Sequence, residues 1–344
     1  MKYRILYFIV SCFALTSCIE DPEIPVNTNA GNFEALWKII DTKYCYLDYK
    51  HINWDSVHTV YKARVDSGMD KYEFFDLMGA MLGELKDGHV NLYSDFDRSR
   101  YWKWFTDYPS NFNSNILYSD RYLGENYRVV GGMRYNFIDN GRIGYIYYGD
   151  FSDTFTDVNM SNILSYFSNC RGLIIDVRNN GGGYISLAEQ LSSYFFTSDT
   201  ITGYISHKTG DGHTDFSAPE AVKTPAHEKI QWQRPVAILT NRMSYSATNS
   251  FVVRMKMAPN AVIIGDKTGG GGGLPLSSEI PNGWMVRFSA CPMYDADMQH
   301  TEWGIDPDIK QDMTTADANN GYDSIIEKAI FYLIYHRNYD WLKE

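Results

Sequence analysis

The segment GLIIDVRNNGGG, residues 172–183, joins a short apolar run to three consecutive glycines. The apolar run predicts a buried β-strand over residues 172–177, and a helical pattern follows at residues 185–196. A strand, a glycine-rich loop and a helix in this order are typical of α/β folds with parallel sheets. This part of the chain is therefore predicted to belong to an α/β core.

The same alternation of strand and helix continues on both sides of this segment, which predicts a mainly parallel sheet. Further strands are expected at residues 143–148, 235–240, 261–265 and 284–290, and further helices at residues 158–168, 247–257 and 321–337. We expect the core to span residues 141–315 and a C-terminal helix to lie within residues 316–344.

A helical pattern precedes the core. The apolar residues of 33–40 have helical spacing, and two more helical patterns lie near residues 53–67 and 71–86. Residues 31–93 are therefore predicted to form an N-terminal helical subdomain. Residues 94–140 show no clear period and are interpreted as a connecting segment.

The composition is that of a folded globular protein, with 344 residues, 44% hydrophobic and 21% charged. This length suggests about two domains. The formal net charge is −11 and no basic run is present, which argues against nucleic-acid binding because phosphate contacts need clustered lysine and arginine. The five cysteines form no CxxC pair and lack metal-ligand spacing, so neither a metal site nor a dense disulfide framework is expected. No cofactor is expected.

The chain begins like a secretory signal peptide, with two basic residues before an apolar run at residues 5–15. This run is too short to cross a bilayer, which takes about twenty residues. The sequence LTSC at residues 15–18 resembles a bacterial lipobox. The resemblance implies a lipoprotein signal peptide over residues 1–17, cleavage before Cys18 and attachment of lipid to Cys18. The alternative is an ordinary signal peptide followed by an incidental cysteine.

Residues 18–30 contain two prolines and three acidic residues and have no period, so they predict a flexible tether. Ile19 is not the aspartate that commonly retains lipoproteins in the inner membrane. An outer-membrane lipoprotein of the bacterial cell envelope is therefore expected.

The strongest indication of chemistry is the segment MSYSAT at residues 243–248, between the predicted strand 235–240 and the predicted helix 247–257. A serine at such a turn exposes its hydroxyl, and the helix N-terminus stabilises negative charge that develops during nucleophilic attack. Ser246 is therefore a candidate nucleophile. The structural alternative is an N-cap, since serine is a preferred capping residue.

The glycines at residues 181–183 have two functional interpretations and one structural one. Consecutive glycines after a strand let backbone N–H groups turn toward a ligand, as an oxyanion hole requires. They could also cradle a phosphate, but neither a GxxxxGKS/T nor a GxGxxG pattern is present. A plain turn is the structural alternative. The five glycines at residues 269–273 are interpreted as a flexible wall of the site.

Three motifs together resemble those of the tail-specific, or C-terminal-processing, serine peptidases. They are DVRNNGGG at residues 176–183, NRMSYSA at residues 241–247 and GDKTGG at residues 265–270. Their order and spacing are those of the family. The resemblance covers about residues 140–312, with a weaker helical match over residues 31–93.

This resemblance implies a crotonase- or ClpP-like α/β core with Ser246 as the nucleophile. It also implies that the N–H groups of Gly182 and Ala247 form the oxyanion hole. One branch of the family uses a Ser–Lys dyad, with the lysine directly after the glycine-rich loop. Gly271 stands at that position here, and Lys267 lies four residues too early, so Lys267 is kept only as a second candidate for the base.

The other branch resembles the core of the tricorn peptidase and uses His and Glu. LKDGH at residues 85–89 is similar to its His-bearing segment, and TEWGIDPD at residues 301–308 is similar to its Glu-bearing one. The resemblance implies that His89 is the general base and that Glu302 orients it, although Glu302 could also be an ordinary loop acid. The tricorn-like enzymes have a second hydroxyl before the histidine, where this chain has Gly88.

A pH dependence follows if His89 is the base. Activity should fall as the pH drops through about 6.5, the ordinary pKa of histidine, because the imidazolium cannot accept a proton. Pairing with Glu302 would keep that midpoint at or above this value unless burial opposes it.

The leading interpretation is a serine endopeptidase of the bacterial cell envelope that hydrolyses peptide bonds through an acyl-enzyme on Ser246. Its partners would be a peptide or protein substrate and the membrane, through a lipid anchor at Cys18. The interval 94–140 is too short for the PDZ module with which many relatives capture a substrate C-terminus, so recognition of a free C-terminus stays open. The natural substrate and the oligomeric state also stay open.

Two rival functions remain. One is a catalytically inactive lipoprotein that binds peptides or lipophiles in the same cleft. The other is a crotonase-type acyl-CoA enzyme, which is disfavoured because an exported chain meets no pool of CoA. The aromatic segment YWKWF at residues 101–105 could wall a substrate cleft, although packing in the core is the simpler interpretation.

Overall fold

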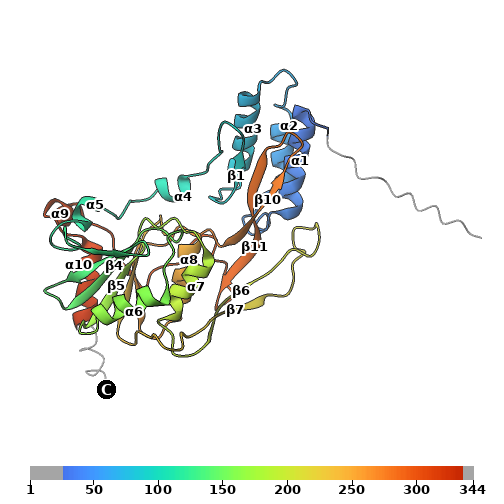
Figure 1. Cartoon of the computed structure of the whole chain (residues 1–344). Helices are drawn as coiled ribbons and strands as arrows, with labels where there is room; N and C mark the ends of the chain where they lie inside the picture. Colours follow the sequence, from blue (N-terminus) through green and yellow to red (C-terminus); the bar gives the residue numbers. More distant parts are fainter. Residues whose placement is uncertain (1–25, 336–344) are drawn as a thin grey trace, which may run out of the picture.

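The computed structural model describes residues 26–335. The predicted signal peptide, Cys18 and residues 336–344 lie outside the described residues. The described chain forms an α/β core and a second unit in which three helices pack on a smaller sheet (Figure 1).

The core contains a seven-stranded sheet in the order β12-β9-β8-β5-β4-β3-β2. The strands from β12 to β4 pair in parallel, whereas β3 and β2 are antiparallel to their neighbours. The prediction of a mainly parallel α/β sheet is therefore confirmed. The strand bounds are β2 Arg128–Val130, β3 Met133–Ile138, β4 Ile143–Tyr148, β5 Gly172–Asp176, β8 Val236–Thr240, β9 Ala261–Gly265 and β12 Ile309–Lys310.

Helices cover both faces of this sheet, as its apolar central strands require. Leu173 and Ile175 face a core that includes residues of α6, α7 and α8, whereas Ile174 between them faces a second core beneath α10. The helix bounds are α5 Ser114–Leu117, α6 Asp157–Tyr166, α7 Ile185–Ser193, α8 Ala247–Met255, α9 Thr315–Asn319 and α10 Ser324–Tyr335. The loops that follow β5, β8 and β9 consequently meet at one edge of the sheet, where parallel α/β folds place their ligands.

The second unit packs its helices against an antiparallel sheet in the order β1-β11-β6-β7, with β10 also paired to β11. Val286 and Phe288 on β11 are fully buried in a core shared with α1 and α3. The bounds are α1 Asn29–Lys43, α2 Trp54–Lys62, α3 Lys71–Gly83, β1 Asn91–Tyr93, β6 Thr200–Ile205, β7 Glu220–Thr224, β10 Gly273–Glu279 and β11 Met285–Asp295. The three predicted N-terminal helices are therefore present.

The grouping of elements differs from the sequence-based segments in two ways. The interval 94–140 is more than a connector, because β2 and β3 lie within it and belong to the core sheet. β10 and β11, which fall inside the predicted 141–315 core, pack instead against the N-terminal helices. Pairing between distant strands leaves no local pattern in a sequence, so neither arrangement could be read from periodicity.

Two further observations concern the described residues alone. Cys45, Cys170 and Cys291 are buried and free. Among residues 26–335, no helix has the length and apolar character needed to span a bilayer.

Candidate active site

Ser246 stands in the turn between β8 and the first residue of α8. Its backbone is strained, with φ 59° and ψ −119°, a region that residues other than glycine rarely occupy. Although Ser246 occupies the N-cap position, its side chain makes no capping hydrogen bond. The Oγ atom lies 2.9 Å from Nε2 of His89 instead. The N-cap interpretation of this side chain is therefore wrong.

Backbone hydrogen bonds from two neighbouring loops hold the turn in this conformation. The amide of Ser246 donates to the carbonyl of Gly270 at 2.9 Å, and the amide of Tyr245 donates to the carbonyl of Asn180 at 3.1 Å. The buried Ser244 hydroxyl donates to the carbonyl of Val177 at 2.8 Å. Hydrogen bonds to the loops after β5 and β9 thus hold the turn after β8 in place.

His89 comes from the second unit, directly before β1. The residue is 3% exposed, and its backbone N–H donates to Oδ1 of Asp87 at 2.8 Å. The Nδ1 atom has no hydrogen-bond partner among the described residues. Burial lowers the pKa of His89 to about 4, despite the nearby charge of Asp87. The ring is therefore neutral near pH 7, as a general base must be.

Glu302 makes no hydrogen bond with His89. Its Oε1 accepts from Nζ of Lys50 at 2.6 Å, and its Oε2 accepts from the amide of Gly272 at 3.1 Å. Burial, reinforced by the charge of Asp87, raises the pKa of Glu302 to about 8. The contact by which Glu302 was expected to orient His89 is therefore not made; Glu302 fixes the glycine loop instead.

Lys50 is a site residue that the sequence did not reveal. Its side chain is 2% exposed, and its Nζ lies 2.6 Å from Glu302 and 3.6 Å from Asp87. Asp87 also accepts hydrogen bonds from the hydroxyls of Tyr44 and Ser289, both at 2.9 Å. Lys50 therefore contacts both buried acids, Asp87, which accepts from the amide of His89, and Glu302, which accepts from the amide of Gly272.

The oxyanion donors named from the resemblance are both next to Ser246. Gly182, at φ +105°, is packed so closely that a Cβ there would lie 2.8 Å from the Cβ of Ser246. Its amide, however, donates to Oδ1 of Asn180 at 3.0 Å. The amides of Ala247 and Gly183 make no hydrogen bond within residues 26–335. The amide of Ala247 can thus donate a hydrogen bond to an oxyanion. The amide of Gly182 can do so only after its hydrogen bond to Asn180 breaks; otherwise the second donor would be the amide of Gly183.

Tyr245 fills the space of two side chains that relatives have and this chain lacks: the lysine at the position of Gly271 and the hydroxyl residue at the position of Gly88. A Cβ at Gly271 would lie 2.5 Å from the Tyr245 ring, and a Cβ at Gly88 would lie 2.8 Å from its hydroxyl. A lysine at position 271 or a serine at position 88 therefore cannot fit beside this ring. Lys267, the second candidate for the base, pairs with Asp306 at 3.3 Å and makes no contact with Ser246.

Two cavities open beside Ser246. One of about 500 Å³ is walled by Tyr101, Trp102, Trp104 and Phe105, and the ring of Trp104 stacks on Tyr245 at 4.1 Å. The other, of about 30 Å³, is a narrow slot between α8 and the loop at Gly271–Gly273. The aromatic segment thus walls the cleft, and its interpretation as core packing was wrong.

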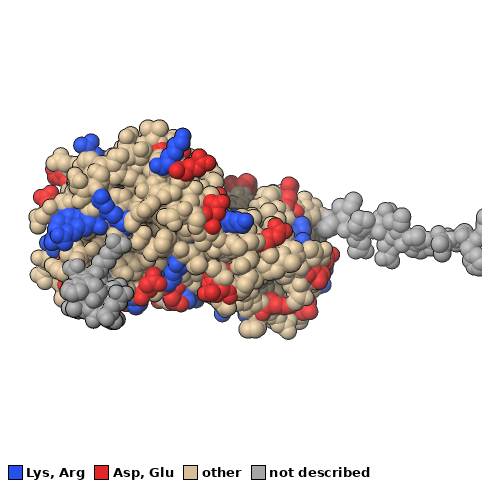
Figure 2. Space-filling model, turned by 90° about the horizontal axis from the view of Figure 1, so that it is seen from below, with Lys and Arg blue, Asp and Glu red and all other residues tan. Residues whose placement is uncertain are grey.

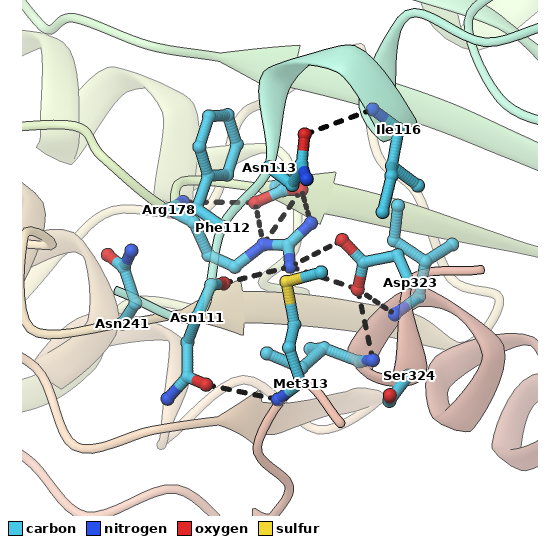
Figure 3. Close-up of polar contacts among 12 residues, drawn as sticks. Asn111, Phe112, Asn113, Ile116, Arg178, Asn241, Met313, Asp323 and Ser324 are labelled. Carbon is cyan, nitrogen blue, oxygen red and sulfur yellow. Dashed lines mark hydrogen bonds and ion pairs between the residues drawn. The ribbon is translucent and has the colours of Figure 1, made fainter. Parts of the chain in front are cut away.

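Arg178, four residues before Gly182, lies at the centre of a polar cluster with Asn111 and Asp323 (Figure 3). This fully buried guanidinium lies 2.6 Å from Oδ2 of Asp176 and 2.9 Å from Oδ2 of Asp323, and it donates to the carbonyl of Asn111 at 3.2 Å. Asp323 in turn accepts from the first amides of α10. The cluster ties the end of β5 to α10 and so fixes the glycine loop.

Replacing Lys50 with methionine is expected to lower the free energy of unfolding by about 3 to 5 kcal/mol, because it leaves the ionised Asp87, whose pKa Lys50 helps to lower, buried without a counter-charge. Urea denaturation followed by tryptophan fluorescence measures this loss. The double variant Lys50→Met/Asp87→Asn should recover part of it, since the uncompensated carboxylate is removed.

The matched control is Lys38→Met, at an exposed lysine that pairs with Asp41 at 3.1 Å. Exposed pairs contribute about 0 to 1 kcal/mol, so this variant should be close to the wild type. Equal stabilities of the Lys50 and Lys38 variants would contradict the ionic role of Lys50.

Comparison with known proteins adds independent information. The profile of peptidase family S41 matches residues 142–311, and that of the tricorn protease C1 domain matches residues 25–83. A protein of Parabacteroides merdae, solved as a candidate peptidase, is 48% identical. The match covers 90% of this chain and 98% of that one, with a TM-score of 0.86.

Two curated relatives are more distant. The carboxy-terminal processing protease CtpB of Bacillus subtilis is 29% identical over 142 residues, 40% of this chain and 27% of its own length. A candidate tricorn-like protease C-terminal subunit of Sulfurisphaera tokodaii is 27% identical over 223 residues, 62% of this chain and 24% of its own length. The chain therefore spans about a quarter of each of these curated relatives.

Proposed function

The chain belongs to peptidase family S41, and we propose that it is a serine endopeptidase that cleaves peptide bonds through an acyl-enzyme on Ser246. The observation that carries the proposal is the 2.9 Å contact between Oγ of Ser246 and Nε2 of a buried His89. Burial keeps that imidazole neutral, and α8 begins at the next residue, Ala247. A nucleophile, a base and a helix N-terminus thus meet at one point.

The reaction follows from this geometry. Nε2 of His89 takes the proton of Ser246 while Oγ forms a bond to the carbonyl carbon of the substrate. The oxygen that becomes negative is stabilised by the amide of Ala247 and by the positive end of α8. His89 then returns the proton to the leaving nitrogen as the C–N bond breaks. A water, deprotonated by His89, hydrolyses the remaining ester and restores Ser246.

The rival function, a binding protein without catalysis, is not favoured by the arrangement of Ser246. Its backbone is strained and its hydroxyl makes no capping hydrogen bond, so neither feature stabilises the helix. Both features instead place Oγ within hydrogen-bond distance of His89. Strain of this kind is commonly stored at functional sites.

Labelling with a serine-directed fluorophosphonate probe tests the proposal. The probe should modify Ser246 and no other serine, and peptide mapping by mass spectrometry identifies the modified residue. Failure of the folded protein to react would leave the binding protein as the better explanation.

For localisation we propose a lipoprotein of the bacterial outer membrane, anchored through Cys18. The supporting features are the LTSC sequence at residues 15–18, the preceding apolar run and Ile19. Acyl chains on Cys18 would supply the membrane affinity, and the acidic, proline-containing residues 18–30 would separate the enzyme from the bilayer.

The Cys18→Ser variant should lose its attached lipid and its partitioning into the detergent phase of Triton X-114. Cys12→Ser serves as the control, because it changes a cysteine that lies before the proposed cleavage site. Unchanged partitioning of Cys18→Ser would refute the anchor.

A further inference from the structure

The larger cavity beside Ser246 is lined by positively charged side chains and by no negatively charged ones among the described residues. Its wall includes Arg98, Arg100 and Arg287, and no aspartate or glutamate lines it within residues 26–335. Acidic residues outnumber lysine and arginine by 42 to 31 in the chain, so the excess of arginine in this cavity does not follow from the overall composition. On the face seen in Figure 2, by contrast, both kinds of charged side chain are scattered over an otherwise uncharged surface.

Arg287 lies on β11 and lines this cavity, because successive side chains of a strand point to opposite faces of the sheet. Its neighbours Val286 and Phe288 are buried in the core on the opposite face. Asn91, the residue paired with Arg287 across β1, lines the same cavity. Arg287 is half-buried, and its guanidinium forms no hydrogen bond or ion pair with any described residue.

The position of Arg287 is close enough to the chemistry to act on a substrate held there. It shares the cavity wall with Ser246 and His89, and its positive charge contributes to the lowered pKa of His89. A partly buried guanidinium without a carboxylate is costly unless a ligand supplies one, and it binds carboxylates through paired hydrogen bonds.

The other two arginines extend the positive charge along the cleft. The backbone N–H of Arg98 donates to Oδ1 of Asp97, but its guanidinium contacts no carboxylate among the described residues and lies 5.8 Å from the centre of the Tyr93 ring. Arg100 is 3.4 Å from Asp97, but both side chains are largely exposed, so that pair is weak. A single carboxylate, such as the end of a peptide chain, could match only one of these three cations.

We propose that this cavity binds acidic side chains of the peptide substrate next to the scissile bond, with Arg287 as the specificity-determining contact. The proposal rests on the proposed peptidase function and names the substrate class for the same site. The aromatic wall at Trp102 and Trp104 supplies apolar contact for the substrate, while the arginines select its charge.

The test compares two fluorogenic heptapeptide amides that carry Glu or Gln on both sides of a central leucine. The wild type should have a kcat/KM about tenfold or more higher for the Glu peptide, the effect of one charge-assisted contact. This ratio should fall toward one in Arg287→Ala and be partly retained in Arg287→Lys. The control Arg171→Ala, an exposed arginine outside the cleft, should keep the wild-type ratio.

Equal use of the two peptides by the wild type, or a ratio that survives Arg287→Ala, would overturn the proposal. A third peptide, the Gln sequence with a free carboxyl terminus, separates side-chain from terminal carboxylate recognition. Preference for this peptide alone would also overturn it.

A binding experiment keeps the two proposals distinguishable. The same peptides are titrated into the Ser246→Ala protein, and tryptophan fluorescence is recorded. Charge-independent hydrolysis that depends on Ser246 would refute the substrate class and leave the peptidase function standing. Absence of Ser246 labelling would refute the peptidase function, and the titration would still decide whether the cavity prefers the Glu peptide over the Gln peptide.

Discussion

The Ser246→Ala protein is expected to lose about 10⁴-fold or more of its peptide turnover and to stay folded, because removal of a catalytic nucleophile has this effect in serine peptidases. Oγ of Ser246 makes its contact with His89 alone and holds no other element in place. Turnover of a fluorogenic peptide measures the loss, and circular dichroism verifies the fold.

Ser244 and Ser250 provide matched controls on the same turn and helix. Ser244→Ala removes a buried hydroxyl that donates to Val177 at 2.8 Å and accepts from the amide of Asn241 at 3.1 Å. It should therefore lower the stability, by about 1 to 3 kcal/mol, yet retain the nucleophile and most of the activity. Ser250→Ala should change both quantities little. Wild-type turnover in Ser246→Ala would show that another residue is the nucleophile.

The pH dependence of kcat/KM is expected to have its acid limb near pH 4 to 5, well below the 6.5 of an ordinary histidine. Burial lowers the pKa of His89 to about 4, so the ring stays neutral and able to accept a proton as the pH falls through 6. Activity should disappear only as the pH approaches the pKa that the His89 imidazole has in the folded protein. Initial rates between pH 3.5 and 8, with fluorescence as a check on folding, measure this limb.

The sequence placed this midpoint at or above 6.5 if Glu302 pairs with the ring and burial does not oppose it. Neither condition is met in the structure, because burial is the largest cause that lowers the pKa of His89. The one partner expected to raise the pKa of His89 does not bind the ring: Glu302 is held by Lys50 and Gly272, and Nδ1 of His89 has no hydrogen-bond partner among the described residues. A midpoint above pH 6 would mean that a carboxylate reaches the ring during turnover.

The companion substitutions separate the candidate bases. His89→Ala should match Ser246→Ala in turnover, because the members of such a pair act as a unit. Glu302→Gln should lose less, and Lys267→Ala should lose least, since Lys267 pairs with Asp306 away from Ser246. Full activity in His89→Ala together with none in Lys267→Ala would return the protein to the Ser–Lys branch.

The local features of the fold could be predicted from the sequence. The strand at Ile143–Tyr148 has the predicted bounds, and the turn at Ser246 has the predicted strand before it and helix after it. Periodicity and turn residues act over a few positions, so they remain visible in a linear pattern. The meeting of Ser246 with His89 was predicted through the family resemblance and not through any local signal.

The features that could not be predicted depend on distant partners. Lys50 and Glu302 are 252 residues apart, and nothing in the neighbourhood of Lys50 distinguishes it from a surface lysine. The role of Tyr245 became apparent only from the space that it fills between Gly88 and Gly271. The pKa of His89 depends on its burial beneath both units, which composition does not indicate.

The position of β11 determines when the enzyme can first act during its synthesis. The proposed base, His89, precedes β1, and β1 is held in register by residues 285–287 of β11. The proposed nucleophile, Ser246, belongs to the other unit. A nascent chain can display residue 89 and even residue 246, but it lacks the strand that brings them together. The protein is thus expected to be inert toward its own biosynthetic machinery until nearly its whole length has emerged, so that proteolytic competence itself reports completed folding.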